Sequence, residues 1–274
     1  MSAPAPPERH WRAFLALPVA LAAVVAGAAT YAIVGVLRAA VTSPPDHHDG
    51  IVGVALHGPP PLLTFSSTLT QDIALVVGAI IAAGLAMPGA SAPRPEDFGL
   101  RPARLWSSAG LVLAGYGVFI ALSAAWTSAL GITARENVPV QLGTYDSGLA
   151  LAGAILLVCV IAPVCEELFF RGYVFSALRR RGLLLAALVT GTAFGLAHVV
   201  SSPIGFIVPL ATLGVILCLL YERTRSLYPC MALHALNNSI AFGVGDGRPW
   251  LIPVCLVTAA TMIYSMSQIV RRIA

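Results

Sequence analysis

The sequence V-C-E-E-L-F-F-R at residues 164–171 places two adjacent carboxylates and a guanidinium inside an apolar run that covers residues 149–178. A run of this length can cross a lipid bilayer as one helix. Ionisable groups at that depth are unfavourable and persist mainly where they pair or act chemically. Glu167 and Arg171 are four residues apart, so they share a helix face and can neutralise each other. Glu166 lies about 100° around the helix from Glu167, and the segment offers it no partner.

The composition of the whole chain predicts a membrane protein. Of its 274 residues, 58% are hydrophobic and 10% are charged, whereas a soluble domain has roughly 25% charged residues. We therefore expect an all-α polytopic fold, a single bundle of about eight transmembrane helices around an intramembrane polar cavity. The net charge of +4 comes from arginines in the loops between apolar runs, which predicts contact with membrane lipid and not with nucleic acid.

Eight apolar stretches account for most of the sequence. They lie at about residues 13–37, 69–87, 105–130, 149–178, 183–200, 204–221, 227–242 and 250–270. If the N-terminus is inside, only Arg38, Arg135 and Arg248 fall in outer loops, and every other arginine except Arg171 is on the inner side. This bias predicts a multi-pass protein of the cell membrane with both termini in the cytoplasm.

The spans suggest four parts. Residues 1–12 would be a disordered cytoplasmic N-terminus, 13–104 the first two spans with their loops, 105–244 a core of the third to seventh spans, and 245–274 a last span. Asp72 would lie at the start of the second span, where a helix N-terminus favours a carboxylate. The preceding loop contains His47, His48, Asp49 and His57, which we interpret as solvated residues because their spacing matches no fixed metal-ligand pattern.

Partners for Glu166 must come from other spans. Only two histidines, His198 and His234, lie within apolar runs, and Asn238 follows His234 by one helical turn on the same face. At about 1.5 Å per residue, these groups and Glu166 lie roughly 14 to 25 Å from the nearest inner arginines. We expect them to meet near mid-membrane, where three helices contribute to one bundle-core site. Taken alone, an intramembrane His or Asn more often makes a contact between helices than acts in catalysis. We also interpret the pair of Glu167 with Arg171 as structural.

Three motifs occur in order: E-E-L-F-F-R at 166–171, F-G-L-A-H at 194–198 and H-A-L-N-N at 234–238. They resemble the E-E-x-x-x-R, F-x-x-x-H and H-x-x-x-N motifs of the CAAX-protease and bacteriocin-processing (CPBP, or Abi) family of intramembrane proteases, which includes type II CAAX prenyl endopeptidases. The resemblance covers roughly 105–244. It implies an intramembrane endopeptidase that acts on membrane-associated or prenylated, CAAX-like protein or peptide substrates, with Phe194 among the supporting residues.

The residues themselves suit this chemistry. A carboxylate in a low-dielectric cavity takes up a proton more readily than one in water, which suits a general base. We expect Glu166 to deprotonate a water that His198 orients, while His234 and Asn238 donate hydrogen bonds to the oxyanion. Glu167 and Arg171 would hold the helix of Glu166 in register.

Two alternatives stay open. Glu166, His198 and His234 could bind zinc with one open position, but the sequence lacks H-E-x-x-H and Asn238 is a rare zinc ligand, so we prefer a site without a cofactor. The second alternative is a non-catalytic membrane transport or immunity factor, in which a Glu-His-His chain could relay protons.

Overall fold

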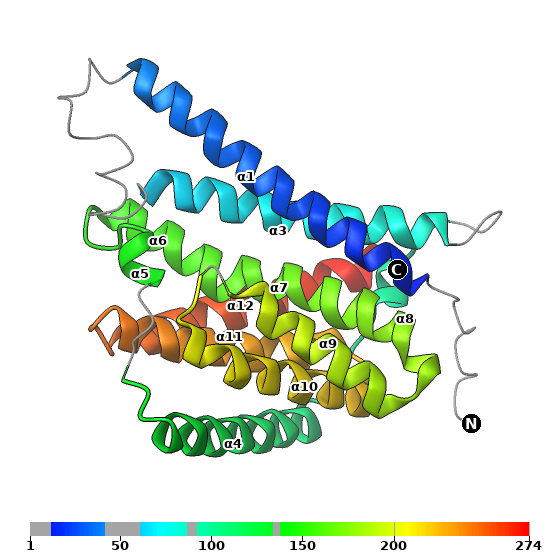
Figure 1. Ribbon diagram of the computed structural model, residues 1–274. Helices are drawn as coiled ribbons and strands as arrows, with labels where there is room; N and C mark the ends of the chain where they lie inside the picture. Colours follow the sequence, from blue (N-terminus) through cyan, green and yellow to red (C-terminus); the bar gives the residue numbers. More distant parts are fainter. Residues whose placement is uncertain (1–11, 42–60, 87–91, 134–137, 200, 274) are drawn as a thin grey trace.

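Long apolar helices run side by side through the described part of the chain (Figure 1). The computed structural model describes residues 12–41, 61–86, 92–133, 138–199 and 201–273, and these ranges contain no β-strand. The long helices are α1 (Ala16–Val41), α3 (Pro61–Leu85), α4 (Leu105–Ala129), α9 (Leu183–Ala197), α10 (Ile207–Thr224), α11 (Leu227–Gly245) and α12 (Leu251–Ile273). One more long helix continues through α6 (Gly148–Leu156), η3 (Leu157–Ile161), α7 (Ala162–Glu167), η4 (Leu168–Phe175) and α8 (Ser176–Leu178). Short elements precede or connect them: η1 (Ala13–Leu15), η2 (Pro95–Phe98), α5 (Val138–Gln141), η5 (Arg179–Arg181) and η6 (Ile204–Phe206).

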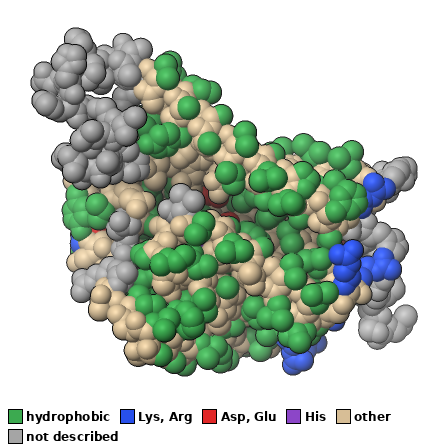
Figure 2. All heavy atoms as spheres, viewed as in Figure 1, with side chains coloured by type: hydrophobic (Ala, Val, Ile, Leu, Met, Phe, Trp, Pro, Cys, Tyr) green, Lys and Arg blue, Asp and Glu red, His purple; other side chains and the backbone are tan. Residues whose placement is uncertain are grey.

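The all-α polytopic fold is confirmed. Within the described residues, six helical segments are long and apolar enough to cross a membrane, the longest of them Gly148–Arg181. The other two long helices fit less easily, since α9 has only 15 residues and α11 contains a histidine and two asparagines. Large hydrophobic side chains such as Leu17 and Trp106 are exposed around the bundle (Figure 2), as a surface facing lipid requires.

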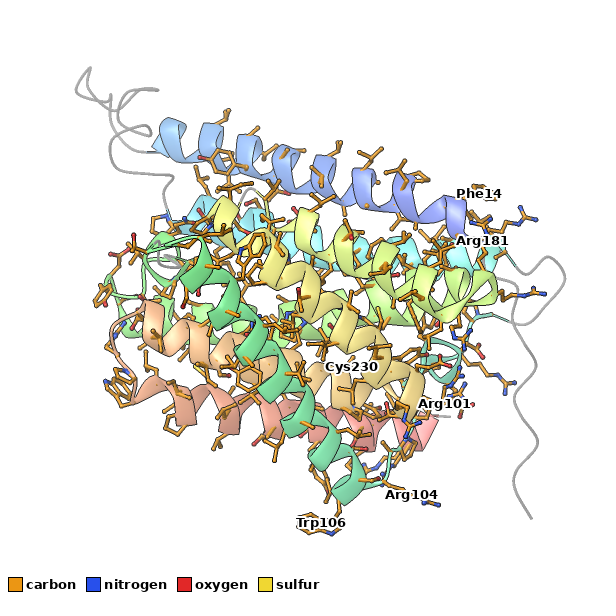
Figure 3. The ribbon with its side chains drawn as sticks, turned by 60° about the horizontal axis from the view of Figure 1, so that its bottom comes forward. Phe14, Arg101, Arg104, Trp106, Arg181 and Cys230 are labelled. Carbon is orange, nitrogen blue, oxygen red and sulfur yellow. The ribbon has the colours of Figure 1, made fainter. Side chains whose placement is uncertain are left out.

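One end of the bundle is rich in arginine. Figure 3 shows Arg101, Arg104 and Arg181 at this end, although they belong to segments far apart in the sequence. Arg179 donates two hydrogen bonds to Glu222, at 2.9 and 2.8 Å, and so joins the end of the central helix to α10. At the opposite end, Thr144 and Arg248 both contact the carboxylate of Asp246. The hydrogen bond to Asp246 raises the pKa of the Arg248 guanidinium, so this loop stays charged.

The central helix is not α-helical throughout. Two π-helical segments, η3 and η4, flank the short α7 that contains Glu166 and Glu167. Pro163 lies in the first turn of α7 and has no N–H, so it cannot donate to the carbonyl one turn earlier. π-Helical turns are rare and often occur at functional sites.

Two expected boundaries were wrong. Helix α3 begins at Pro61, not at residue 69, so Asp72 lies well inside the helix and is buried. The polar stretch that suggested a loop is helical, and its hydroxyls find their acceptors within the helix: Ser66 Oγ donates to the Leu62 carbonyl and Ser67 Oγ to the Thr64 carbonyl. Helix α9 ends at Ala197, which leaves His198 just beyond it, where the His198 carbonyl accepts bonds from the next turn.

Some expectations fall outside the described residues. They are the disorder of residues 1–12, of which only Arg12 is described, the loop residues His47, His48, Asp49 and His57, and the outer arginine Arg135. The side chain of Arg38 is not described either.

Helices α9 and α10 approach each other closely at glycines. A Cβ on Gly214 would lie 2.8 Å from the Gly191 Cα and 2.9 Å from the Gly191 carbonyl oxygen, both backbone atoms that cannot rotate away. The same close approach lets the Gly214 carbonyl accept a hydrogen bond from Arg171 Nη2 at 3.0 Å. Glycine at this position therefore brings a backbone acceptor to a buried cation.

We expect Gly214→Ala to lower the free energy of unfolding by about 1–3 kcal/mol, because the added methyl group overpacks a rigid contact. Thermal unfolding of the purified protein in detergent measures the change. Gly110→Ala is the matched control, since no atom lies within 4 Å of its added Cβ on the exposed face of α4. Equal stability of the two variants would contradict the proposed contact.

Candidate active site

A buried ion cluster lies at the centre of the bundle. Arg171 Nη1 donates to Glu167 Oε1 at 2.8 Å, and both side chains are fully buried. The same oxygen, Glu167 Oε1, also lies 2.9 Å from Nδ1 of His234 on α11. The expected pairing of Glu167 with Arg171 is thus confirmed. The contact between Glu167 and His234 was not expected, because the sequence alone does not show which helices meet.

Phe194 packs at the junction of this cluster. It is fully buried, and its ring centroid lies 4.6 Å from the Arg171 guanidinium carbon, a cation–π distance. The ring also lies 4.9 Å from that of His198 and 5.4 Å from that of His234. One aromatic side chain therefore separates and orients three polar groups.

Glu166 points away from the ion cluster, as its position on the helix predicts. Its Oε2 is buried without a hydrogen-bond partner and lies 3.8 Å from Nε2 of His198. The other ring nitrogen, His198 Nδ1, lies 2.8 Å from the Phe194 carbonyl oxygen. A carbonyl only accepts, so Nδ1 has the proton and a neutral His198 presents an unprotonated Nε2 to Glu166. At this separation, one water oxygen could lie about 2.8 Å from both atoms.

Asn238 is held by the π-helical part of the central helix. Its Nδ2 donates to the Val158 carbonyl in η3 at 2.9 Å, and its Oδ1 accepts from Asn237 Nδ2 at 3.3 Å. A carboxamide nitrogen has two hydrogens, so one N–H of Asn238 is available to a ligand.

Two connected hollows reach these groups. A cavity of about 190 Å³ is lined by Glu166, His198, His234 and Asn238, so the four expected residues share one space. A larger groove of about 1190 Å³ is bordered by α1, α3 and α9, and Glu166 and His198 line it as well. Figure 2 shows acidic side chains at the bottom of a recess in this apolar face. The site is therefore open to the side of the bundle.

Asp72 also lines the groove, a placement that the sequence analysis missed. Its side chain is 3% exposed, and its Oδ2 has no hydrogen-bond partner. The signal was present in the sequence, because a lone carboxylate inside an apolar run is a functional-site hypothesis by default. Because the helix was expected to begin at residue 69, Asp72 was interpreted as a carboxylate at a helix N-terminus.

The donor set does not fit a zinc ion. Among the described residues, no three His, Cys, Asp or Glu side chains form a group that could hold a metal. Glu166 faces His198, whereas His234 turns its Nδ1 toward Glu167. Nδ1 of His234 is therefore already paired, and only its Nε2 remains for a ligand.

Comparisons with known proteins agree with the motifs. Residues 148–240 match the family model described as "Type II CAAX prenyl endopeptidase Rce1-like", which confirms the resemblance over that part of the chain. The sequence is 26% identical over 136 residues to the "Putative membrane peptidase YdiL" of Bacillus subtilis (strain 168). This match covers 49% of the chain and 53% of that relative, about half the length of each. No solved structure matches the chain.

We expect Glu167→Gln to lower the free energy of unfolding by about 3–5 kcal/mol, because it leaves the buried Arg171 without its anion. The pair of Arg179, 35% exposed, with Glu222, 14% exposed, provides the matched control, and Glu222→Gln should cost at most about 1 kcal/mol. Unfolding in detergent, followed by tryptophan fluorescence, compares the two. Similar losses would contradict a special role for the buried cluster.

Proposed function

We propose that the protein is an intramembrane endopeptidase that hydrolyses a peptide bond of a membrane-associated substrate. One observation favours this above all: the carboxylate of Glu166, whose buried Oε2 has no hydrogen-bond partner, faces Nε2 of His198 beside a cavity that polar groups of α11 also line. The similarity of residues 148–240 to a prenyl endopeptidase family supports the same reaction.

In this proposal Glu166 is the general base. Its carboxylate takes a proton from a water that Nε2 of His198 holds by accepting the other hydrogen. The water oxygen forms a bond to the carbonyl carbon, and the carbonyl oxygen becomes an oxyanion. The proton on Glu166 then passes to the amide nitrogen as the C–N bond breaks, which returns Glu166 to the carboxylate.

His234 and Asn238 are the proposed oxyanion donors. In a doubly protonated His234, Nδ1–H donates to the Glu167 carboxylate and Nε2–H can donate to the oxyanion. The free N–H of Asn238 supplies the second hydrogen bond. Removing a single donor of this kind typically costs about 10²–10³ in kcat. Glu167, Arg171 and Phe194 act by positioning.

The groove favours a substrate that is itself in the membrane. Its wall contains apolar side chains of α1, the central helix and α9, such as Leu17, Phe170 and Leu196, and Figure 2 shows a recess in the apolar face. We propose a protein or peptide segment, prenylated and CAAX-like or simply membrane-associated, that enters sideways from lipid. The proposal places the protein in the cell membrane with its arginine-rich end in the cytoplasm.

Glu166→Gln should abolish cleavage of a quenched fluorescent peptide by the purified protein in lipid nanodiscs, because an amide cannot accept the proton of water. Glu96→Gln makes the same chemical change at an exposed position and should retain full activity. Retained cleavage in Glu166→Gln would refute the assigned base.

A chelator should leave the rate unchanged, since the donor set does not fit zinc. Loss of activity on chelation, with recovery on adding zinc, would favour the metalloprotease alternative instead. A non-catalytic factor would show no cleavage by the wild-type protein under any of these conditions.

A fluorescent protein fused to the C-terminus should fluoresce in a bacterial host, because the arginine-rich end of α12 is expected in the cytoplasm. A periplasmic phosphatase fused at the same point should be inactive. Fusions placed after Gly247, at the opposite end of the bundle, serve as the control and should give the reverse result.

A further inference from the structure

Asp72 is a buried carboxyl group that the proposed mechanism does not use. It lies on α3, thirteen residues before the last residue of this helix, Leu85. This distance corresponds to about 20 Å along the helix, so Asp72 lies near the middle of the membrane. Its side chain is 3% exposed, its Oδ2 has no hydrogen-bond partner, and it lines the same groove as Glu166.

Several groups that can bear charge share the groove with Asp72. Helix α7, which packs against α3, brings Glu166 to the same groove, and the thiol of Cys165 is next to it in the chain. His198 lines the groove from the end of α9, and Tyr31 lines it from α1. The other groups on the groove wall that can bear charge are Arg12, Arg180 and Arg181. Arg180 and Arg181 lie at the end of the central helix, where Figure 3 shows Arg181 at the arginine-rich end, and Asp72 Oδ2 has no hydrogen-bond partner.

Two carboxyl groups in one apolar groove cannot both be charged without a large electrostatic penalty. The Glu166 side chain is 16% exposed and lines both the cavity and the groove, whereas Asp72 is 3% exposed, so burial disfavours the charged form more strongly at Asp72. The unequal surroundings assign the proton to Asp72 and the negative charge to Glu166. Pairs of carboxyl groups whose environments differ in this way divide into an acid and a base.

We infer that Asp72 is the uncharged carboxylic acid of a two-carboxyl site whose ionised member is Glu166. Asp72 acts through Glu166 as a positioning residue and does not contact the scissile bond. It keeps the groove at a single negative charge. If Asp72 also ionised, the second charge would oppose the negative charge that develops on the substrate oxygen, and the rate would fall.

Infrared spectroscopy tests the protonation state without any substrate. The purified protein at neutral pH should give the C=O stretching band of a protonated carboxyl group, which shifts in D₂O. Asp72→Asn should remove this band, whereas Glu166→Gln should keep it. Thr68→Val, a non-titrating change one turn earlier on α3 beside the same groove, should also keep it. A band that is absent from the wild type, or that survives in Asp72→Asn, would overturn the inference.

The catalytic part of the inference rests on the proposed function and has its own test. Asparagine is neutral and similar in size to the protonated acid, so Asp72→Asn should keep most of the activity at neutral pH. The fall of kcat at alkaline pH should move upward by about one pH unit or more, because the second ionisation is gone. In Asp72→Glu, kcat should decrease at the same alkaline pH as in the wild type. In Thr68→Val, this pH should also be unchanged.

The two proposals fail in distinguishable ways. If Glu166→Gln is inactive but Asp72→Asn has the wild-type pH profile and infrared band, the peptidase proposal stands and the role of Asp72 falls. If the wild type cleaves no peptide, the peptidase proposal falls, and the infrared band still decides whether Asp72 is protonated.

Discussion

The organisation of this membrane bundle depends on one oxygen atom, Glu167 Oε1. It accepts from Arg171 on its own helix and contacts His234 on α11, and each of the three side chains is at most 2% exposed. Burying three ionisable groups is unfavourable unless each is compensated, so the cluster fixes how α7, η4 and α11 meet. Arg171 extends the same network to the backbone of α10 through the Gly214 carbonyl. The position of Glu166, the next residue along the chain, follows from this arrangement.

Much of the fold could be predicted from the sequence because apolar runs and arginines follow the bilayer. The eight stretches correspond to the long helices, and the i, i+4 spacing of Glu167 and Arg171 gave their pairing. The prediction of helix boundaries failed where polar side chains form their hydrogen bonds within a helix. Ser66 and Ser67 bond to their own helix, so the start of α3 was placed too late and Asp72 was misread.

The site could be predicted only in part, because side-chain partners depend on tertiary contacts. Motif order and depth placed Glu166, His198, His234 and Asn238 in one space, and they line one cavity. Neither spacing nor depth could reveal that Glu167 contacts His234, or that Val158 in a π-helical turn holds Asn238. These contacts decide which hydrogens are free, and hence which chemistry the residues can support.

The main-chain carbonyl and the ring of Phe194 have separate roles. Its main-chain carbonyl sets the tautomer of His198, and any amino acid could supply that acceptor. Its ring stacks against the Arg171 guanidinium, which only an aromatic side chain can do. The aromatic character of the F-x-x-x-H motif is therefore explained by an arginine on another helix, and a tyrosine or tryptophan that fitted the space would preserve it while leucine would not.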